Sequence, residues 1–231
     1  MTSISIKAVP FHYSIKWFTS SWALAKKHYW FALGMQFVIF VINLSLSRIP
    51  LVGGMASAVV TYLLFYGQLT IVKKMLANQS FEFADLFMAF SNKELVIKSI
   101  PLLAIVASLG IPAIFAQQFM EFYIHDLQMM MLITGGIVFY SLFVAGLVVF
   151  SAPLILIKNL NFTQTIGPNI KASLINFLPM AAASVIAVVL VTLSIMMLFI
   201  PFIFVVLPLT FPIITIVYET IFEGLELGNT V

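Results

Sequence analysis

Six long apolar segments dominate the sequence and restrict what the chain can fold into. They lie at about residues 29–47, 51–72, 95–119, 129–157, 174–200 and 201–222. Each is about as long as the ~20 residues that an α-helix needs to cross the hydrocarbon core of a bilayer. Since a backbone in lipid must satisfy its own hydrogen bonds, such segments form helices. The sequence therefore predicts an all-α integral membrane protein with six transmembrane helices.

The composition indicates that lipid is the main solvent of this protein. Apolar residues make up 62% of the chain and charged residues only 8%, whereas a soluble domain carries roughly 25% charged residues. The first apolar segment has full span length and is not expected to be a cleaved signal peptide. The chain has no cysteine, which excludes disulfides and cysteine-ligated metals. Its basic residues are not clustered as in a nucleic-acid-binding protein.

The placement of basic residues predicts the orientation in the membrane. All eleven Lys and Arg residues except Arg48 lie in segments that six spans place on one side. Because positive loops stay in the cytoplasm, both termini are expected there. The predicted organisation is a cytoplasmic amphipathic segment (1–28), a six-helix membrane domain (29–222) and an acidic cytoplasmic tail (223–231). The fifth and sixth spans follow one another directly, and only Pro201 marks the boundary between them.

Three segments beside the spans have the apolar spacing of amphipathic helices. Their apolar stripes comprise Phe11, Ile15, Phe18 and Trp22; Phe83, Leu86, Phe87 and Phe90; and Ile166, Ile170, Leu174 and Phe177. Such stripes predict short helices that lie at the cytoplasmic membrane surface. Trp17, Tyr29 and Trp30 are interpreted as aromatic anchors at the level of the lipid headgroups.

The same three segments suggest an internal repeat of one interfacial helix followed by a helical hairpin. Residues 71–87 can be laid over residues 155–170 with a two-residue gap. Both stretches run from an apolar span end through Lys to Phe and then a polar turn. A true repeat predicts three quasi-equivalent units in parallel orientation. The alternative, which the sequence leaves open, is that the similarity reflects constraints shared by all membrane proteins.

Six short motifs, spread over nearly the whole chain, carry a family resemblance. They are WALAKKHYW (22–30), IPLVGGMAS (49–57), FADLFMAF (83–90), APLIL (152–156), IKASLINFLP (170–179) and PIITIVYETIFEG (212–224). In this order they resemble the BPSS-type family of small six-span proteobacterial inner-membrane proteins. The resemblance implies a bacterial inner-membrane location and a six-span architecture. That family has no assigned activity, so no site residues are implied. Glu219 and Glu223 depart from its more basic closing segment.

Small residues and prolines within the spans mark positions for close packing or for helix breaks. The packing candidates are Gly53, Gly54, Ser57, Ala58, Gly135 and Gly136, and the break candidates are Pro101, Gly110, Pro112 and Pro153. Small side chains allow membrane helices to approach one another, and we expect this packing to be intramolecular. Each proline frees a carbonyl, which a neighbouring helix is expected to satisfy.

Few residues in the chain could carry chemistry. No ionisable side chain lies near the middle of a predicted span, which argues against ion-coupled transport. Glu121, His125 and Asp126 share a predicted external loop, but a zinc site needs three or four protein ligands and we expect a solvated loop. Glu219 and Glu223 are expected to pair with lysines at the same membrane surface. The sequence therefore predicts no metal, no cofactor and no catalytic residues.

Three hypotheses of function follow. The first is a non-enzymatic accessory, assembly or envelope-maintenance protein that binds membrane lipids or another membrane protein, and no nucleic acid. The second is a passive transporter, channel or lipid-moving protein with a cavity among proline-bent helices. The third, a membrane-embedded enzyme acting on lipids, rests only on the acidic tail and the external loop. The first is our prediction, because no charged centre lies within the spans.

Overall fold

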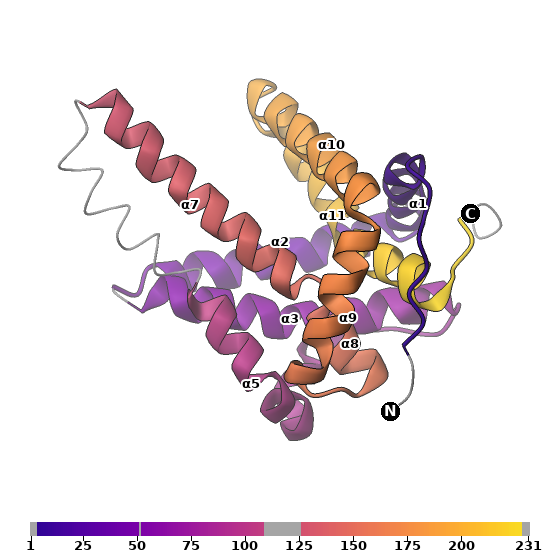
Figure 1. Ribbon diagram of the computed structural model, residues 1–231. Coiled ribbons are helices and arrows are strands. Elements are labelled where there is room, and N and C mark those ends of the chain that lie inside the picture. The colour runs from indigo at the N-terminus through magenta and orange to yellow at the C-terminus, as the bar shows by residue number, and fades with distance from the viewer. Residues whose placement is uncertain (1–3, 51, 109–125, 228–231) are drawn as a thin grey trace. The chain divides into compact units, whose positions relative to one another are not determined.

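The computed structural model describes residues 4–50, 52–108 and 126–227, and it contains two compact units (Figure 1). Unit 1 comprises Met1–Val38, Gly67–Leu86 and Gly167–Val231, and unit 2 comprises Ile39–Tyr66 and Phe87–Ile166. Every element in the described ranges is a helix. The all-α prediction is therefore confirmed.

The helices are labelled in Figure 1. In chain order they are α1 (Tyr13–Lys27), α2 (Tyr29–Ser47), α3 (Gly53–Leu76), η1 (Phe83–Phe87), α4 (Met88–Ser91), α5 (Lys93–Ser108), α7 (Leu127–Val148), α8 (Ser151–Lys158), α9 (Phe162–Ile175), α10 (Phe177–Met196), η2 (Phe202–Val206), α11 (Leu207–Tyr218) and η3 (Glu219–Glu223). Of the three elements labelled η, η1 is a 3₁₀ turn, whereas η2 and η3 are π-helical.

In the described ranges, four helical stretches are long and apolar enough to cross a membrane. They are Tyr29–Ser47, Gly53–Leu76, Phe177–Ser194 and Phe202–Glu223. They correspond to the first, second, fifth and sixth predicted spans, so the chain is a candidate multi-pass membrane protein. Of the third predicted span the structure describes α5, which ends at Ser108. The remainder of that span, with Gly110 and Pro112, lies outside the described residues, as do Glu121 and His125.

The fourth predicted span is divided into two helices. α7 ends at Val148 and α8 begins at Ser151, so Pro153 occupies the first turn of α8, where a missing backbone N–H costs little. The Val148 carbonyl, at the end of α7, accepts a hydrogen bond from the Tyr62 hydroxyl at 3.3 Å. Pro101, in contrast, lies inside α5, which continues through it to Ser108.

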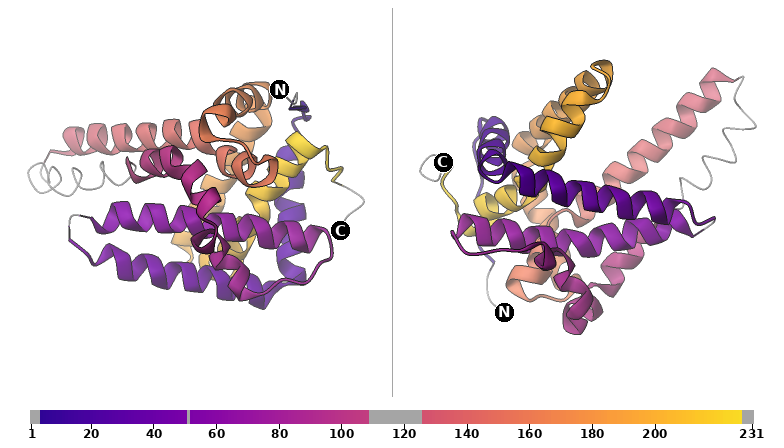
Figure 2. Two further views of the ribbon diagram at one scale, coloured as in Figure 1. Left: turned by 90° about the horizontal axis from the view of Figure 1, so that it is seen from below. Right: turned by 180° about the vertical axis from the view of Figure 1, so that it is seen from behind.

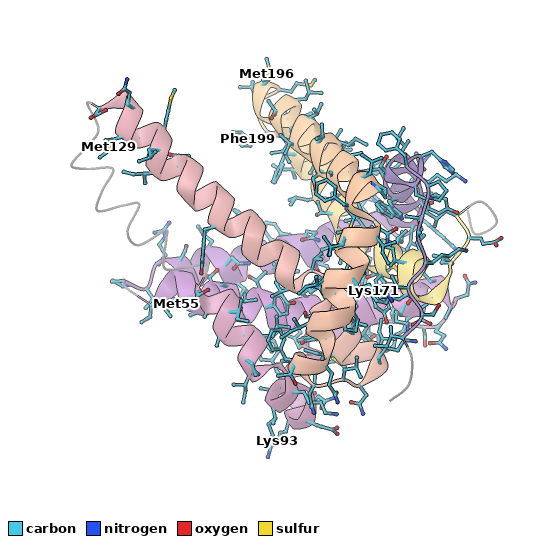
Figure 3. The ribbon with its side chains drawn as sticks, in the orientation of Figure 1. Met55, Lys93, Met129, Lys171, Met196 and Phe199 are labelled. Carbon is cyan, nitrogen blue, oxygen red and sulfur yellow. The ribbon has the colours of Figure 1, made fainter. Side chains whose placement is uncertain are left out.

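The last two spans form a hairpin in unit 1 (Figure 2), in which α10 contacts η2 at the start of the last span. α10 ends at Met196, and Leu198 and Phe199 then adopt positive φ angles of 57° and 63°. Pro201 precedes η2, in agreement with its predicted role as the boundary between the spans. Figure 3 shows Met196 and Phe199 at the turn of this hairpin, and Lys171 of α9 lies away from that turn.

A proline in the last span frees a carbonyl that another helix satisfies. Pro208 lies near the start of α11 and has no N–H to donate to the carbonyl of Phe204. The hydroxyl of Tyr29, at the start of α2, donates to that carbonyl oxygen at 2.9 Å. This contact joins the beginning of α2 to the last span within unit 1. It also satisfies the Phe204 carbonyl, to which Pro208 cannot donate.

The predicted interfacial segments are helical, and most of their apolar stripes are exposed. Exposed large side chains include Phe11 and Ile15; Phe83, Phe87 and Phe90; and Ile166, Ile170, Leu174 and Phe177. The opposite faces are buried and consist mainly of small or polar side chains: Ser14, Ser21 and Ala25 in α1, and Thr165, Asn169 and Ala172 in α9. Small side chains permit close helix packing. The exposed stripes have the placement expected of faces that contact a membrane.

Trp17 does not have the predicted position. Its side chain is 0% exposed, because it lies on the face of α1 that packs against α10 and α11. The interpretation of Trp17 as an aromatic-belt anchor is therefore wrong. Phe18, although part of the apolar stripe, is buried as well. Trp30, in contrast, is 78% exposed, as expected of a side chain that contacts the membrane interface.

The small residues differ in what surrounds them. A Cβ atom on Gly53 would lie 2.4 Å from the carbonyl oxygen of Leu46, at the turn between α2 and α3. In the described part of the chain, no atom lies within 4 Å of a Cβ built on Gly54, Gly135 or Gly136.

Ser57 belongs to a polar contact between α2 and α3 in unit 2. The hydroxyls of Ser57 and Thr61 both donate to Asn43 Oδ1, the latter at 2.7 Å. Asn43 Nδ2 donates to the carbonyl of Ile39 at 2.9 Å. Ala58 is half-buried. Such hydroxyl and amide contacts hold helices together in lipid, where the alternative is an unsatisfied polar group.

Candidate functional site

The charged end of α3 is tied to two other elements of unit 1. Lys73 and Lys74 occupy the last turn of α3, where a positive charge complements the helix dipole. The ammonium of Lys74 lies 2.7 Å from Asp85 Oδ1 in η1. The ammonium of Lys73 lies 3.4 Å from Glu219 Oε1 in η3, and the Glu219 side chain is only 14% exposed. The expected pairing of Glu219 with a lysine is therefore confirmed.

Asp85 gives this end of α3 an acid-sensitive contact. The hydrogen bond from Lys74 is the main cause that lowers the pKa of Asp85 below its ordinary 3.8. Since the folded-state pKa is the lower one, the contact stabilises the fold above pH ~4 and is lost as the pH falls through the folded-state value. We expect Asp85→Asn to lower the free energy of unfolding at neutral pH by about 0.5 kcal/mol.

The measurement is the thermal unfolding midpoint of the detergent-solubilised protein against pH. The difference between wild type and Asp85→Asn should be constant above pH ~4 and should shrink towards zero below it. Glu82→Gln is the matched control, because Glu82 is an exposed carboxylate of the same segment with no ion pair in the described residues. Equal effects of the two substitutions would contradict the assignment.

The chain beyond η3 folds back onto α1. Gly224, with a φ of 73°, ends η3 in the left-handed conformation. The carbonyl of Glu219 then accepts hydrogen bonds from the N–H groups of Gly224 and Leu225. Lys16 Nζ in α1 donates to the carbonyl of Leu227 at 3.2 Å. These bonds hold the tail against α1.

Asn176 fixes the N-terminal segment against the same end of unit 1. It is fully buried at the one-residue elbow between α9 and α10. Its Oδ1 accepts from the Val9 N–H at 2.9 Å, and its Nδ2 donates to the Lys7 carbonyl at 3.1 Å. The Lys7 N–H donates to the carbonyl of Ile221 at 2.8 Å. No sequence pattern pointed to this role of Asn176.

A groove of about 580 Å³ opens in unit 1. Its volume is within the ~300–1,000 Å³ of typical small-molecule sites. It is formed by α1, the end of α3, α11 and the tail. Its apolar residues are Ala23, Leu24, Met75, Leu76, Ile216, Leu225 and Leu227, and its polar residues are Ser20, Lys27 and Asn78. All of them belong to unit 1. The groove therefore combines apolar and polar surface with a single charged side chain among its described lining residues.

Lys27 is the only charge that lines the groove in the described part of the chain. It is exposed and has no carboxylate partner among the described ion pairs. Burial, and then the charge of Lys27, lower the pKa of His28 below its ordinary 6.5. The adjacent imidazole is therefore mostly neutral at pH 7, and Lys27 supplies the positive charge.

No family model, curated protein or solved structure matches this chain. The residues of the site therefore carry the functional argument. The described ranges contain no group of three or more His, Asp or Glu side chains that could hold a metal ion. The groove offers a cation and an apolar wall, a combination that suits non-covalent binding of an amphiphile.

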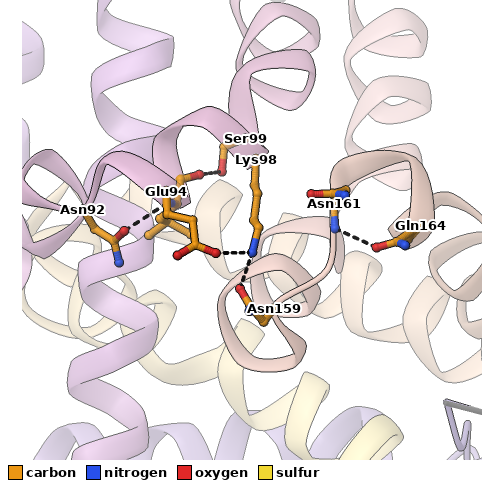
Figure 4. Close-up of polar contacts among 8 residues, drawn as sticks. Asn92, Glu94, Lys98, Ser99, Asn159, Asn161 and Gln164 are labelled. Carbon is orange, nitrogen blue, oxygen red and sulfur yellow. Dashed lines mark hydrogen bonds and ion pairs between the residues drawn. The ribbon is translucent and has the colours of Figure 1, made fainter. Parts of the chain in front are cut away.

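Unit 2 has a separate polar cluster around Lys98 (Figure 4). Lys98 Nζ lies 2.5 Å from Glu94 Oε1 in the preceding turn of α5 and 2.6 Å from Asn159 Oδ1 in the turn after α8. Asn92 Oδ1 accepts a hydrogen bond from the N–H of Leu95 and so caps the start of α5. The cluster ties α5 to the α8–α9 turn. Because Lys98 already has two oxygen partners, we interpret the cluster as structural.

Proposed function

We propose that this chain is a six-span protein of the bacterial inner membrane that binds protein or lipid at its cytoplasmic surface and catalyses no reaction. The observation that carries the proposal is the groove in unit 1, which pairs an apolar wall with the unpaired cation of Lys27. Its neighbourhood is held by hydrogen bonds and ion pairs from Asn176, Lys16, Lys73 and Lys74. Such a surface suits recognition by shape and charge.

The proposed topology adds two spans to the four long apolar helices. α7, with 22 residues, supplies one of them, and α5 begins the other. Both termini are then cytoplasmic, and so are the lysines around the groove, in keeping with the preference of positive loops for the cytoplasm. The resemblance to the BPSS-type family implies the same architecture and the same membrane.

Equivalent features in α1 and α9 support the proposed repeat. The buried positions have the same spacing in the two helices: Ser14, Trp17 and Ser21 in α1, and Phe162, Thr165 and Asn169 in α9. Each helix is followed by a single elbow residue, His28 or Asn176, and then by a long apolar helix.

The chain also turns in the same way after α3, α8 and η3. It adopts the left-handed conformation at Asn78, Asn159 and Gly224, respectively. These are the ends of the second helix in each proposed hairpin. The shared pattern is what three parallel units of an interfacial helix and a hairpin would produce.

The proposal is tested by what remains bound to the tagged protein after gentle detergent extraction from its own host. We expect quantitative mass spectrometry to find a stoichiometric protein partner or a selectively enriched lipid. An unrelated multi-span protein, extracted and purified in the same way, sets the background level. Recovery of the chain with neither a partner nor an enriched lipid would contradict the proposal.

A lipid-moving protein or channel is the second candidate function. It is favoured by the last span, which carries a π-helical turn at each end and Pro208 and Pro212 between them. Interrupted helices of this kind often accompany transport pathways and functional sites. Vesicles reconstituted with the protein should then pass ions or flip labelled lipids faster than empty vesicles. Equal rates would exclude this function.

A further inference from the structure

We propose that the groove in unit 1 binds an anionic phospholipid, with the lipid phosphate at Lys27 and an acyl chain along the apolar wall. This inference rests on the proposed function, because it names the class of molecule that the cytoplasmic surface binds. It follows from the position of Lys27 beside the first predicted span, from the charges around the groove and from the chemistry of its walls.

Lys27 lies next to the start of the first predicted span. Lys27 ends α1, and α2 begins at Tyr29, so only His28 separates Lys27 from the first span. Tyr29 and the largely exposed Trp30 start that span, and aromatic side chains of this kind collect at the membrane–water interface. A phosphate at this level is within reach of the Lys27 ammonium, since lysine side chains extend towards headgroups.

The charges select an anion at one position. Three other lysines near the groove have oxygen partners: Lys16 the Leu227 carbonyl, Lys73 the Glu219 carboxylate and Lys74 the Asp85 carboxylate. Lys27 has no carboxylate partner in the described ranges, and among the described lysines it is the one that lines the groove. An unpaired cation beside a bilayer attracts anionic headgroups.

The walls require an occupant that is both charged and apolar. Leu24, Leu76 and Leu225 are half-buried and contribute aliphatic surface to the groove. Ser20 and Asn78 place hydrogen-bonding groups in the same groove as Lys27. A free phosphate would leave the apolar wall exposed to water, at a cost that grows with its area. A phospholipid covers the wall with its acyl chain and presents its phosphate to Lys27.

The test uses the purified full-length protein, reconstituted in vesicles of equal parts phosphatidylglycerol and phosphatidylcholine. After gentle re-extraction, native mass spectrometry counts the lipids that each protein molecule retains. We expect phosphatidylglycerol to be retained about fivefold over phosphatidylcholine, the factor that corresponds to roughly 1 kcal/mol per lysine at an anionic surface. Lys27→Gln should remove this preference.

Two further variants separate the groove from the general surface charge. Lys26→Gln is the matched control, because Lys26 is the adjacent exposed lysine of α1 and does not line the groove. It should keep the preference within about twofold. Ala23→Trp places a large ring in the groove and should lower retention of both lipids. The thermal midpoint of unfolding checks that each variant remains folded.

Several outcomes would overturn the inference. They are equal retention of the two lipids by wild type, equal losses in Lys26→Gln and Lys27→Gln, and displacement of the bound lipid by inorganic phosphate. A stoichiometric protein partner that is recovered from the host with wild type and lost with Ala23→Trp would show that a protein occupies the groove. In that case the lipid site fails while the proposed function stands. The absence of any partner or enriched lipid would remove both.

Discussion

Replacing Trp17 with alanine is expected to lower the free energy of unfolding by about 3–5 kcal/mol, the range for truncation of a buried aromatic side chain. Trp17 is 0% exposed on the face of α1 that packs against α11. Its removal would leave a cavity between these helices, and α1 would become accessible to proteases. The thermal midpoint of the detergent-solubilised protein and the rate of proteolytic cleavage within α1 measure the two effects.

Two substitutions on the same helix serve as controls. Ile15 is 58% exposed on the opposite face, so Ile15→Ala should change stability in detergent by less than ~0.5 kcal/mol. Trp17→Phe keeps most of the apolar volume and removes an indole N–H that has no hydrogen-bond partner in the described structure. Its cost should be clearly smaller than that of alanine. If Ile15→Ala destabilised the protein as much as Trp17→Ala, the assignment of the two faces would be wrong.

The contrast between Ile15 and Trp17 shows what the sequence could and could not predict about the interfacial helices. Apolar stripes at helical spacing are a strong signal, and those at residues 11–22 and 166–177 predicted helices where α1 and α9 lie. The second stripe did not reveal the elbow at Asn176, which places Phe177 in α10. The spacing also did not reveal which aromatic residues face protein. In lipid, apolar side chains gain little by facing protein, and small side chains determine where helices meet. Trp17 is buried because Ser14 and Ser21 lie beside it on the packing face.

Span positions were predictable where length and composition alone decide them. The first span, predicted at residues 29–47, is α2. The second extends beyond its predicted end to Leu76, since two lysines in the last turn of a helix are favourable and do not stop it. The fourth was predicted as one overlong span that tilts or bends near Pro153, and the chain is divided between Val148 and Ser151, just before that proline.

The candidate site was not predictable from the sequence. Its lining residues come from three stretches that lie far apart in the chain, within residues 20–27, 75–78 and 216–227, and no local pattern links them. The lysines were visible as a topology signal, and the pairing of Glu219 with Lys73 followed from their predicted membrane side. That Lys27 lines the groove without a carboxylate partner among the described ion pairs could be recognised only once the groove and those ion pairs were known.

Gly67→Ala is expected to have the second large effect, because Gly67 lets the backbone of η1 approach α3. A Cβ atom at this position would lie 2.1 Å from the carbonyl oxygen of Leu86 and 2.5 Å from its Cα. The neighbouring atoms belong to the backbone of a fully buried residue, so they cannot move aside as a flexible side chain would. We expect a loss of about 2–3 kcal/mol, towards the upper end of typical overpacking costs.

Gly54→Ala is the matched control in the same helix and should have the opposite sign. No described atom lies within 4 Å of a Cβ on Gly54, so alanine there should stabilise α3 by up to ~1 kcal/mol through helix propensity. Thermal midpoints in detergent would compare the two variants, and shifts in the same direction would contradict the close approach at Gly67. Since Asp85 precedes Leu86, displacement of η1 should also weaken the contact between Asp85 and Lys74. Gly67→Ala should therefore lose part of the acid dependence that Asp85→Asn removes, and this links the packing of η1 to the charged end of α3.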